Sequence, residues 1–129
     1  LRTVEELMIT GNKIPFVNLD MKMKRALEII SKKKLGTLIV QNSRKVTVGI
    51  ITDGQIRRSN QNNNNLLNLT VKKLMTKNPI TIDQDTLAEK ALSMMNTKKI
   101  TSLCVHNKKN KLKTIGIIHI HNLLENNIN

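Results

Sequence analysis

The sequence is almost free of aromatic residues. Among its 129 residues Phe16 is the single aromatic one, and Trp and Tyr do not occur. A hydrophobic core must therefore be built from Ile, Leu, Val and Met, and the hydrophobic content of 39% suffices for one compact domain or two small ones. Six methionines would make that core adaptable. With a single aromatic side chain, the chain also lacks the series of stacking surfaces that hold single-stranded nucleic acid.

Cysteine and long apolar runs are equally scarce. Cys104 is the sole cysteine, which excludes an internal disulfide framework. No segment approaches the roughly 18 apolar residues of a membrane span, and no signal peptide is recognisable. We therefore expect a reducing, cytoplasmic location and no membrane partner. Because the chain begins at Leu1 rather than at methionine, we also expect a fragment of a longer protein.

Acidic residues are few, 9 against 22 basic ones, and the net charge is +13. Residues 1–65 carry a net charge of +7 and residues 66–129 carry +6, so no basic arm or tail stands out. Two interpretations remain open: a compositional bias toward Lys, Asn and Ile, or attraction to polyanions. The even distribution favours phosphorylated small molecules, and we expect no nucleic-acid partner.

What the chain does contain is an internal repeat. Residues 4–8 (VEELM) return as residues 71–75 (VKKLM), and residues 49–51 (GII) return as residues 116–118, both at an offset of 67. Between these segments the offset is 65, as shown by Asp20 and Asp85. Two copies of one unit predict a pseudo-two-fold pair with ligand sites in the cleft between the copies.

Each copy predicts the element order β-α-β-β-α, so the fold class is α/β (α+β). After a short amphipathic turn and a proline-marked extended segment, Asp20 and Asp85 occupy positions expected for helix N-caps. The predicted hairpin strands are residues 37–40 and 46–51 in the first copy, and residues 102–106 and 112–118 in the second. The closing helices are residues 53–60 and 120–127. The predicted boundaries are repeat 1 at 1–61, an Asn-rich linker at 62–70, and repeat 2 at 71–129.

The segment Thr52-Asp53-Gly54-Gln55 lies where the first hairpin meets its helix. Thr followed three residues later by Gln is a capping box, which satisfies two backbone donors. The same helix N-terminus offers N–H groups and partial positive charge to a phosphate, and Arg57 would add cationic reach. Both interpretations, capping alone and capping with ligand contact, remain open.

The equivalent segment of the second copy is His119-Ile120-His121-Asn122. A turn centred near Lys109 would pair Cys104 with Thr114 and place His119 roughly 17 Å further along the strand. That separation argues against a joint Cys–His metal site, because zinc ligands lie about 2–2.3 Å from the metal. The two histidines remain candidates for contact with a phosphate or carboxylate.

No pattern of catalytic residues is present. The sequence has no paired carboxylates, no Ser-His-Asp order and no Walker-type glycine loop. Cys104 lies in an apolar run, so we expect it in the core. Burial there would raise the pKa of its thiol and make the thiol unreactive. His106, beside a lysine-rich turn, is expected at the surface.

Taken together, the two copies resemble a tandem pair of CBS domains (the cystathionine-β-synthase motif module). The resemblance rests on the Val-x-x-Leu-Met openings, on Pro15 and Pro79, and on the Gly-Ile-Ile endings, and it covers essentially the whole chain. The strings MITGNKIP at residues 8–15, GIITDGQIRR at 49–58 and GIIHIHNLL at 116–124 further resemble the C-terminal regulatory region of bacterial arabinose-5-phosphate isomerases.

That resemblance implies a regulatory module without isomerase activity of its own. In the family, a preceding catalytic domain interconverts ribulose 5-phosphate and arabinose 5-phosphate for the synthesis of Kdo, a sugar of lipopolysaccharide. CBS pairs that bind adenosine often use Thr/Ser-x-x-Asp, whereas Gln55 and Asn122 stand at the acidic position here. The departure favours an anionic sugar nucleotide or other nucleotide as effector, with no required cofactor.

Seven residues are the predicted ligand contacts, all where a hairpin meets a helix: Thr37, Thr52, Asp53, Arg57, Thr101, His119 and His121. We expect no metal and no catalytic residue, and we expect self-association, most simply as a homodimer. Two alternatives remain open: a structural oligomerisation module without ligand, and a basic nucleic-acid-binding module.

Overall fold

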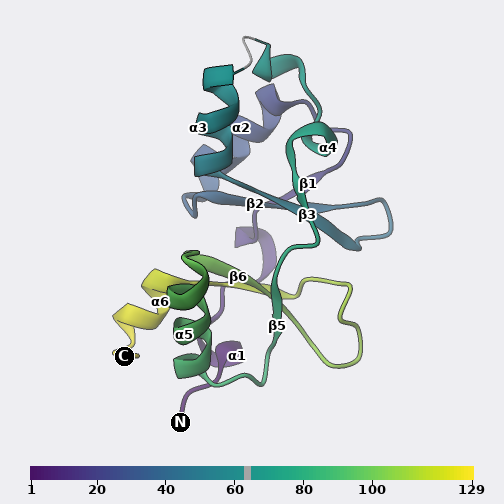
Figure 1. The fold of residues 1–129 in the computed structure, drawn as a ribbon. Coiled ribbons are helices and arrows are strands. Elements are labelled where there is room, and N and C mark those ends of the chain that lie inside the picture. The colour runs from purple at the N-terminus through teal and green to yellow at the C-terminus, as the bar shows by residue number, and fades with distance from the viewer. Residues whose placement is uncertain (63–64) are drawn as a thin grey trace. The chain divides into compact units, whose positions relative to one another are not determined.

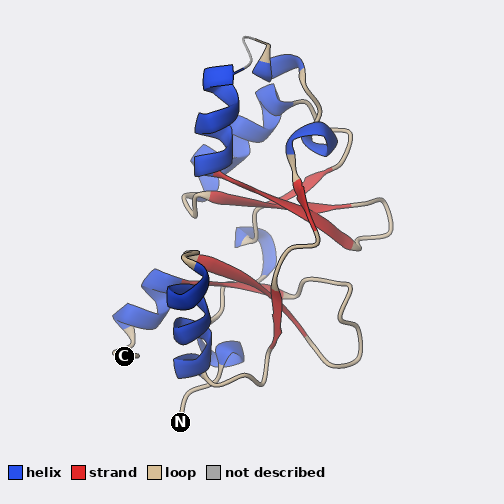
Figure 2. Cartoon of the chain, in the orientation of Figure 1, coloured by secondary structure: helices blue, strands red, loops and turns tan. Residues whose placement is uncertain are grey.

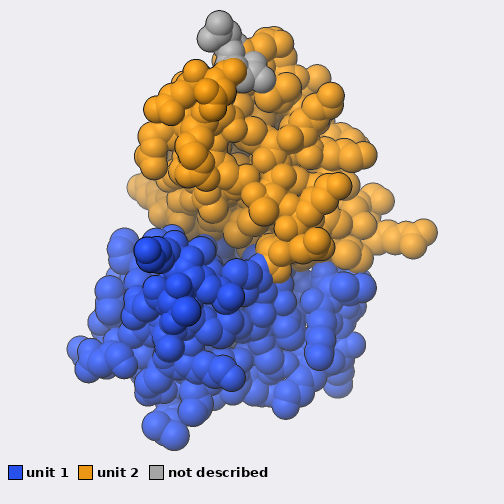
Figure 3. All heavy atoms as spheres, in the orientation of Figure 1, with its two compact units in different colours: residues 1–14, 80–129 blue, residues 15–79 orange. Residues whose placement is uncertain are grey.

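A computed structural model describes residues 1–62 and 65–129 as a mixed α/β fold with two separate sheets. The predicted fold class is confirmed. The chain forms two compact units, which Figure 3 colours separately: unit 1 comprises residues 1–14 and 80–129, and unit 2 comprises residues 15–79. No helix within the described residues has the length and apolar character needed to cross a lipid bilayer.

Unit 2 contains a four-stranded sheet in the order β1-β2-β3-β4 (Figure 1). Its strands are β1 (Phe16–Asn18), β2 (Thr37–Gln41), β3 (Thr47–Thr52) and β4 (Thr76–Lys77). The β1–β2 pair is parallel, and the other two pairs are antiparallel. The helical elements of the unit are α2 (Met23–Lys33), α3 (Asp53–Asn62), the 3₁₀ turn η2 (Leu66–Asn68) and α4 (Val71–Leu74).

The core of unit 2 follows from the two periodicities of its sequence. On β2, the alternate residues Leu38 and Val40 point to one face of the sheet and join Ile51 of β3 in the core. On α2, the buried residues Met23, Ala26 and Ile30 are spaced as one helical face. The predicted amphipathic helix is thus confirmed, and it covers the apolar face of the hairpin.

Unit 1 repeats this plan with the three-stranded sheet β5-β6-β7. Its strands are β5 (Thr81–Asp83), β6 (Ser102–His106) and β7 (Gly116–His119), and its helices are α1 (Val4–Leu7), α5 (Ala88–Lys98) and α6 (Ile120–Glu125); the 3₁₀ turn η1 (Gly11–Lys13) follows α1. β5 runs parallel to β6, and β6 runs antiparallel to β7. Helices and strands of both units are distinguished by colour in Figure 2.

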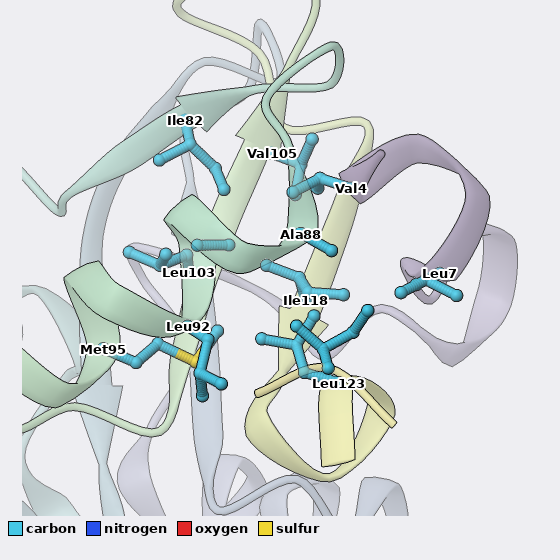
Figure 4. Close-up of a cluster of buried hydrophobic side chains, with 12 residues drawn as sticks. Val4, Leu7, Ile82, Ala88, Leu92, Met95, Leu103, Val105, Ile118 and Leu123 are labelled. Carbon is cyan, nitrogen blue, oxygen red and sulfur yellow. The ribbon is translucent and has the colours of Figure 1, made fainter. Parts of the chain in front are cut away.

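The core of unit 1 includes side chains from the start of the chain. Val4 and Leu7 of α1 lie beside residues from α5, β6, β7 and α6 (Figure 4). Val4 is fully buried, and its N–H donates to the Thr86 carbonyl at 2.8 Å. Val4 and Leu7 are therefore an integral part of a core whose other residues begin at Ile82.

The opening segment of each repeat lies in the unit that holds most of the other repeat, so we call the two opening segments exchanged. β4, from the opening of repeat 2, pairs with β3 of repeat 1 through Ile50 and Thr76. At the equivalent place in unit 1, Ile9 from the opening of repeat 1 bridges Ile117 of repeat 2. The residues that follow each Val-x-x-Leu-Met opening thus bond to the sheet that belongs mainly to the other repeat, as the strand β4 in unit 2 and as a single bridge at Ile9 in unit 1.

The compact units consequently do not follow the boundaries of the sequence repeats, 1–61 and 71–129. The predicted linker at 62–70 is also partly structured: Asn62 ends α3, and Leu66 is buried in the core of unit 2. Residues 63 and 64 of that linker lie outside the described residues.

The prediction that Asp20 and Asp85 cap helices is wrong. The N-cap residues of α2 and α5 are Lys22 and Leu87, and neither cap has a side-chain hydrogen bond. Both aspartates lie in the preceding turn: the Asp20 N–H donates to Asn18 Oδ1 at 3.1 Å, and the Asp85 N–H donates to Asp83 Oδ1 at 2.8 Å. These turn-forming bonds compete with capping, and both helices begin three residues after the aspartates.

The predicted register of the second hairpin is wrong as well. β7 spans Gly116–His119 instead of 112–118, and Cys104 lies opposite Ile117, not opposite Thr114. The cause lies in the loop, where Asn107 Oδ1 accepts from the Asn110 N–H and Asn110 Oδ1 accepts from the Leu112 N–H. These local side-chain bonds hold residues 107–114 outside the ladder, and the Ile115 N–H is the first to bond across to β6, at the Val105 carbonyl. His106, expected at the surface, is buried at the end of β6.

Candidate ligand-binding corners

In unit 2, the first corner is formed by Thr52, the last residue of β3, and the first turn of α3. The Thr52 N–H donates to Gln55 Oε1 at 3.1 Å, and the Gln55 N–H donates to Thr52 Oγ1 at 3.3 Å. The predicted capping box is confirmed. Its two reciprocal bonds fix the direction in which α3 leaves the sheet.

Two further predicted residues meet at this corner. Thr37 lies opposite Thr52 across the hairpin, and its hydroxyl donates to the Ile51 carbonyl at 3.2 Å. The Asp53 N–H donates to the Gly36 carbonyl at 3.0 Å, and the Asp53 carboxylate lies over Gly36, 3.1 Å from where a Cβ would stand. Gly36 has φ +68°, which favours glycine, so the backbone and the carboxylate both require this residue.

Arginine side chains cover the first turn of α3. A Cβ on Gly54 would lie 3.2 Å from Nη1 of Arg58 and 3.9 Å from Nη2 of Arg57. Both guanidinium groups therefore fold back over the N-terminal turn, where helix N–H groups already favour negative charge. The predicted Arg57 belongs to the corner, and Arg58 joins it. The arrangement sets two positive charges beside the helix N-terminus, with the Asp53 carboxylate as the opposing charge.

Gln55 also bonds to a second segment of the chain, which the sequence did not indicate. Its Nε2 donates to the Leu74 carbonyl at 3.2 Å and to Thr76 Oγ1 at 2.6 Å. One carboxamide thus caps α3 with its oxygen and holds the exchanged segment 74–76 with its nitrogen. The side chain is committed to structure, which leaves it little capacity for a ligand.

In unit 1, the second corner is built in the same way from different residues. The His119 N–H donates to Asn122 Oδ1 at 2.9 Å, and His119 Nδ1 accepts from the His121 N–H at 3.1 Å. The rings of His119 and His121 are 4.6 Å apart between centroids. An imidazole nitrogen therefore replaces the Thr52 hydroxyl as the acceptor of the N-cap.

The structure places Ser102, rather than Thr101, opposite His119. Ser102 is buried and occupies the place that Thr37 has in the first corner. Thr101 is exposed, and its carbonyl accepts from the Ile120 N–H at 2.8 Å. In unit 2 the Gly36 carbonyl accepts from the Asp53 N–H in the same way. The 65-residue offset of the preceding helices would have identified Ser102 as the equivalent of Thr37.

The pKa of His119 is lowered, first by burial and second by the nearby charge of His121. Acceptance of the His121 N–H by Nδ1 acts in the same direction, since a protonated Nδ1 could not accept it. The neutral form is thus favoured in the folded protein, and folding is linked to the proton on this ring.

We expect the thermal stability to decrease on acidification because of His119. The unfolded chain, with an ordinary pKa near 6.5, binds the proton first. The stabilisation is therefore fully present above pH 6.5 and is lost as the pH falls through the lowered pKa. His119→Asn retains a capping acceptor without a titrating ring, and it should flatten the melting temperature between pH 7.5 and 5. His121→Gln is the matched control and should retain most of the slope. Equal slopes in the wild type and His119→Asn would contradict the linkage.

The structure offers neither a thiol nucleophile nor a metal cluster in its described part. Burial raises the pKa of the Cys104 thiol to about 11, and its place in the core is confirmed. Within residues 1–62 and 65–129, no group of three His, Cys, Asp or Glu side chains could hold a metal ion. The separation predicted between Cys104 and His119 was wrong, because His119 lies opposite Ser102, two residues from Cys104.

The protein thus contains two copies of one fold, each with a corner where a strand meets a helix. The CBS domain family matches residues 4–61 and residues 71–128. The chain belongs to the CBS domain family. It contains two CBS domains, and the resemblance inferred from the Val-x-x-Leu-Met openings and the Gly-Ile-Ile endings is confirmed.

The proteins with similar sequences are much longer than this CBS pair. The chain is 36% identical over 124 residues to the uncharacterized protein RP505 of Rickettsia prowazekii, and 35% identical over 125 residues to the arabinose 5-phosphate isomerase KdsD of Salmonella typhi. Each match covers 96% of this chain but 37% of the relative. The similarity to the isomerase is thus confined to its CBS part.

Solved structures share the fold of the CBS pair at lower identity. CBSX2 in complex with AMP superposes with a TM-score of 0.83 at 23% identity, covering 98% of this chain and 96% of CBSX2. The CBS-domain protein ATU1752 of Agrobacterium tumefaciens gives 0.85 at 19% identity, with 98% and 93% covered. The CBS pair of MJ0100, in complex with 5'-methylthioadenosine and S-adenosyl-L-methionine, gives 0.81 at 20%, with 97% and 94% covered.

Proposed function

We propose that this CBS pair senses an anionic nucleotide or sugar nucleotide and regulates an attached sugar-phosphate isomerase. The attached enzyme would interconvert arabinose 5-phosphate and ribulose 5-phosphate for lipopolysaccharide synthesis in the cytoplasm. The proposal is supported by the identity to KdsD across 96% of this chain. The CBS fold is not itself catalytic, so any activity belongs to the region of the relatives outside this chain.

The observation that carries ligand binding is the first corner. It combines the N-terminus of a ten-residue helix with two guanidinium groups folded over Gly54. A phosphate is the ligand group that this combination fits best. We assign the ligand contacts to Thr52, Asp53 and Arg57, with Arg57 and the Thr52 hydroxyl toward the phosphate, the Asp53 carboxylate toward a sugar hydroxyl, and Thr37 as the buried support behind them.

The second corner contributes differently to the proposal. His119 and His121 offer imidazole donors, and Thr101 exposes its side chain at the edge of β6. Among the described residues, the Asn122 side chain has one hydrogen bond, to His119, whereas Gln55 also holds the exchanged segment. The two corners therefore present different chemistry, and we propose that they are not equivalent in binding.

A thermal-shift panel tests the sensing function. AMP, CMP, sugar phosphates and CMP-linked sugars are added to the 129-residue chain, and a ligand at 100 times its dissociation constant should add about 2.7 kcal/mol to the stability. Arg57→Ala should weaken the affinity for the ligand roughly tenfold and so reduce the thermal shift. The melting temperature without ligand should stay unchanged. Lys90→Ala, an exposed cation on α5, is the matched control and should leave the shift intact.

A flat panel would reject the sensing function in favour of the structural alternative. In that case the protein should still self-associate, and light scattering would report a homodimer or larger oligomer. An unchanged affinity in Arg57→Ala would remove this residue from the site while leaving sensing itself in place.

A further inference from the structure

The compact units divide the charge of the chain unevenly, although the two halves of the sequence do not. Unit 2 carries 13 basic and 3 acidic residues, a net charge of +10, whereas unit 1 carries 9 and 6, a net charge of +3. A compositional bias would act on the whole chain alike. A compositional bias therefore does not account for the excess of positive charge in unit 2, and a function of its surface would.

Part of this excess gathers where the start of α2 meets the segment from η2 to α4. The Val71 N–H donates to the Met21 carbonyl at 2.8 Å, and the Lys72 N–H donates to the Leu19 carbonyl at 3.0 Å. The side chain of Lys22 donates to the Asn68 carbonyl at 3.2 Å. These bonds place two distant parts of the sequence side by side, and together the two segments carry four exposed lysines: Lys22, Lys24, Lys72 and Lys73.

Carboxylates balance these lysines only in part. Glu28 is 2.8 Å from the Arg25 guanidinium, and Asp53 lies at the first corner over Gly36. Asp20, the one remaining acidic residue of unit 2, is exposed between Leu19 and Met21 beside Lys72, so one negative charge opposes the four positive ones. The four lysines consequently have an excess of charge that a partner of opposite sign can neutralise.

An exposed apolar side chain belongs to the same surface. Leu67 of η2 is 50% exposed and immediately precedes Asn68, whose carbonyl holds the Lys22 side chain. We call Lys22, Lys24, Leu67, Lys72 and Lys73 the lysine face. A leucine among lysines suits the interface of an anionic membrane, where the leucine enters the acyl boundary and the lysines reach lipid phosphates.

We propose that the lysine face of unit 2 binds peripherally to anionic lipid bilayers. Such contact needs no membrane-spanning segment, but it departs from the expectation of no membrane partner drawn from the sequence. Nucleic acid suits this surface less well, because Leu67 has no counterpart on a phosphate backbone and Phe16 is the only aromatic residue of the chain. The proposal is independent of ligand sensing at the corners.

The expected affinity is moderate and depends on salt. Each lysine near an anionic surface contributes about fivefold to the partition, and a partly buried leucine contributes about fivefold more. Sedimentation with vesicles of 70% phosphatidylcholine and 30% phosphatidylglycerol should therefore retain the protein, whereas pure phosphatidylcholine should not. Raising the salt to 0.5 M should release it.

Matched variants test the location of the contact. Lys72→Gln with Lys73→Gln should weaken binding about 25-fold, and Leu67→Ser should weaken it about fivefold. Lys90→Gln with Lys98→Gln on α5 removes the same charge elsewhere, and Leu124→Ser removes a leucine of similar exposure, 53%. Both controls should stay within about twofold of the wild type.

Three results would overturn the proposal. The first is no retention on the anionic vesicles. The second is an equal loss in the Lys72/Lys73 and Lys90/Lys98 variants, which would show a response to net charge alone. The third is retention by duplex or single-stranded DNA, weakened by the Lys72/Lys73 change, without vesicle binding, which would identify a nucleic-acid surface. Loss of the ligand-induced thermal shift in Arg57→Ala would leave the proposal untouched.

Discussion

Val4→Asp should unfold unit 1 at temperatures where the wild type is folded. Val4 is fully buried among side chains of α5, β6 and β7. A carboxylate there would lie among apolar side chains, and burying it costs more than about 4 kcal/mol, a large part of the stability of a small domain. Thermal unfolding followed by circular dichroism should show the loss. Glu5→Asp, at an exposed neighbouring position, is the control and should change little.

Hydrogen exchange would show which part of the protein depends on Val4. Because the opening segments are exchanged, the milder Val4→Ala should accelerate exchange in β6 and β7, which lie more than 95 residues away in sequence. Val71→Ala should do the same for β2 and β3. The reverse result, with Val4→Ala loosening β2 and β3, would show that each repeat folds with its own opening segment.

Gly49→Ala should destabilise unit 2 by about 2–3 kcal/mol, although it adds a single methyl group. A Cβ at this position would lie 2.6 Å from Sδ of Met75 and 2.9 Å from the carbonyl oxygen of Thr76. The methionine can move aside, but the Thr76 oxygen belongs to β4 and cannot move without disturbing its pairing with β3. Overpacking against backbone is costly for that reason. Urea unfolding would measure the loss.

Gly54→Ala is the matched control for Gly49→Ala. Its Cβ would meet the flexible ends of Arg57 and Arg58 inside α3, and alanine is the better helix former by about 0.5–1 kcal/mol. We therefore expect an unchanged or raised stability. A destabilisation equal to that of Gly49→Ala would show that the close approach of β4 is not the cause.

The same close approach explains why the glycine and the methionine recur together in the sequence. Gly116 of unit 1 faces Met8 and the carbonyl oxygen of Ile9, as Gly49 faces Met75 and Thr76. Each pair joins the ending of one repeat to the opening of the other. The repeat pattern therefore records contacts between the repeats as much as structure within them.

Much of the local structure could be predicted from the sequence because its causes are local. The capping box between Thr52 and Gln55, the apolar face of α2 and the burial of Cys104 depend on residues close to one another in the chain. The failures are also local in origin. Asn18 and Asp83 take up the turns that precede α2 and α5, so Asp20 and Asp85 do not become caps.

The composition and the repeat by themselves determined the fold class and the approximate place of both corners, and the resemblance of the repeated motifs to CBS domains indicated the family. Periodicity and capping suffice for the fold class and the corners, since hydrophobic patterning selects helices and strands before any long-range contact forms. The tertiary structure alone decided that the opening segments change places, that Gln55 bonds to Leu74 and Thr76, and that unit 2 holds most of the positive charge. Pairing of Ile9 with Ile117 spans more than 100 residues. Such a contact is selected by the burial and hydrogen bonding it completes, and no local pattern of residues encodes it.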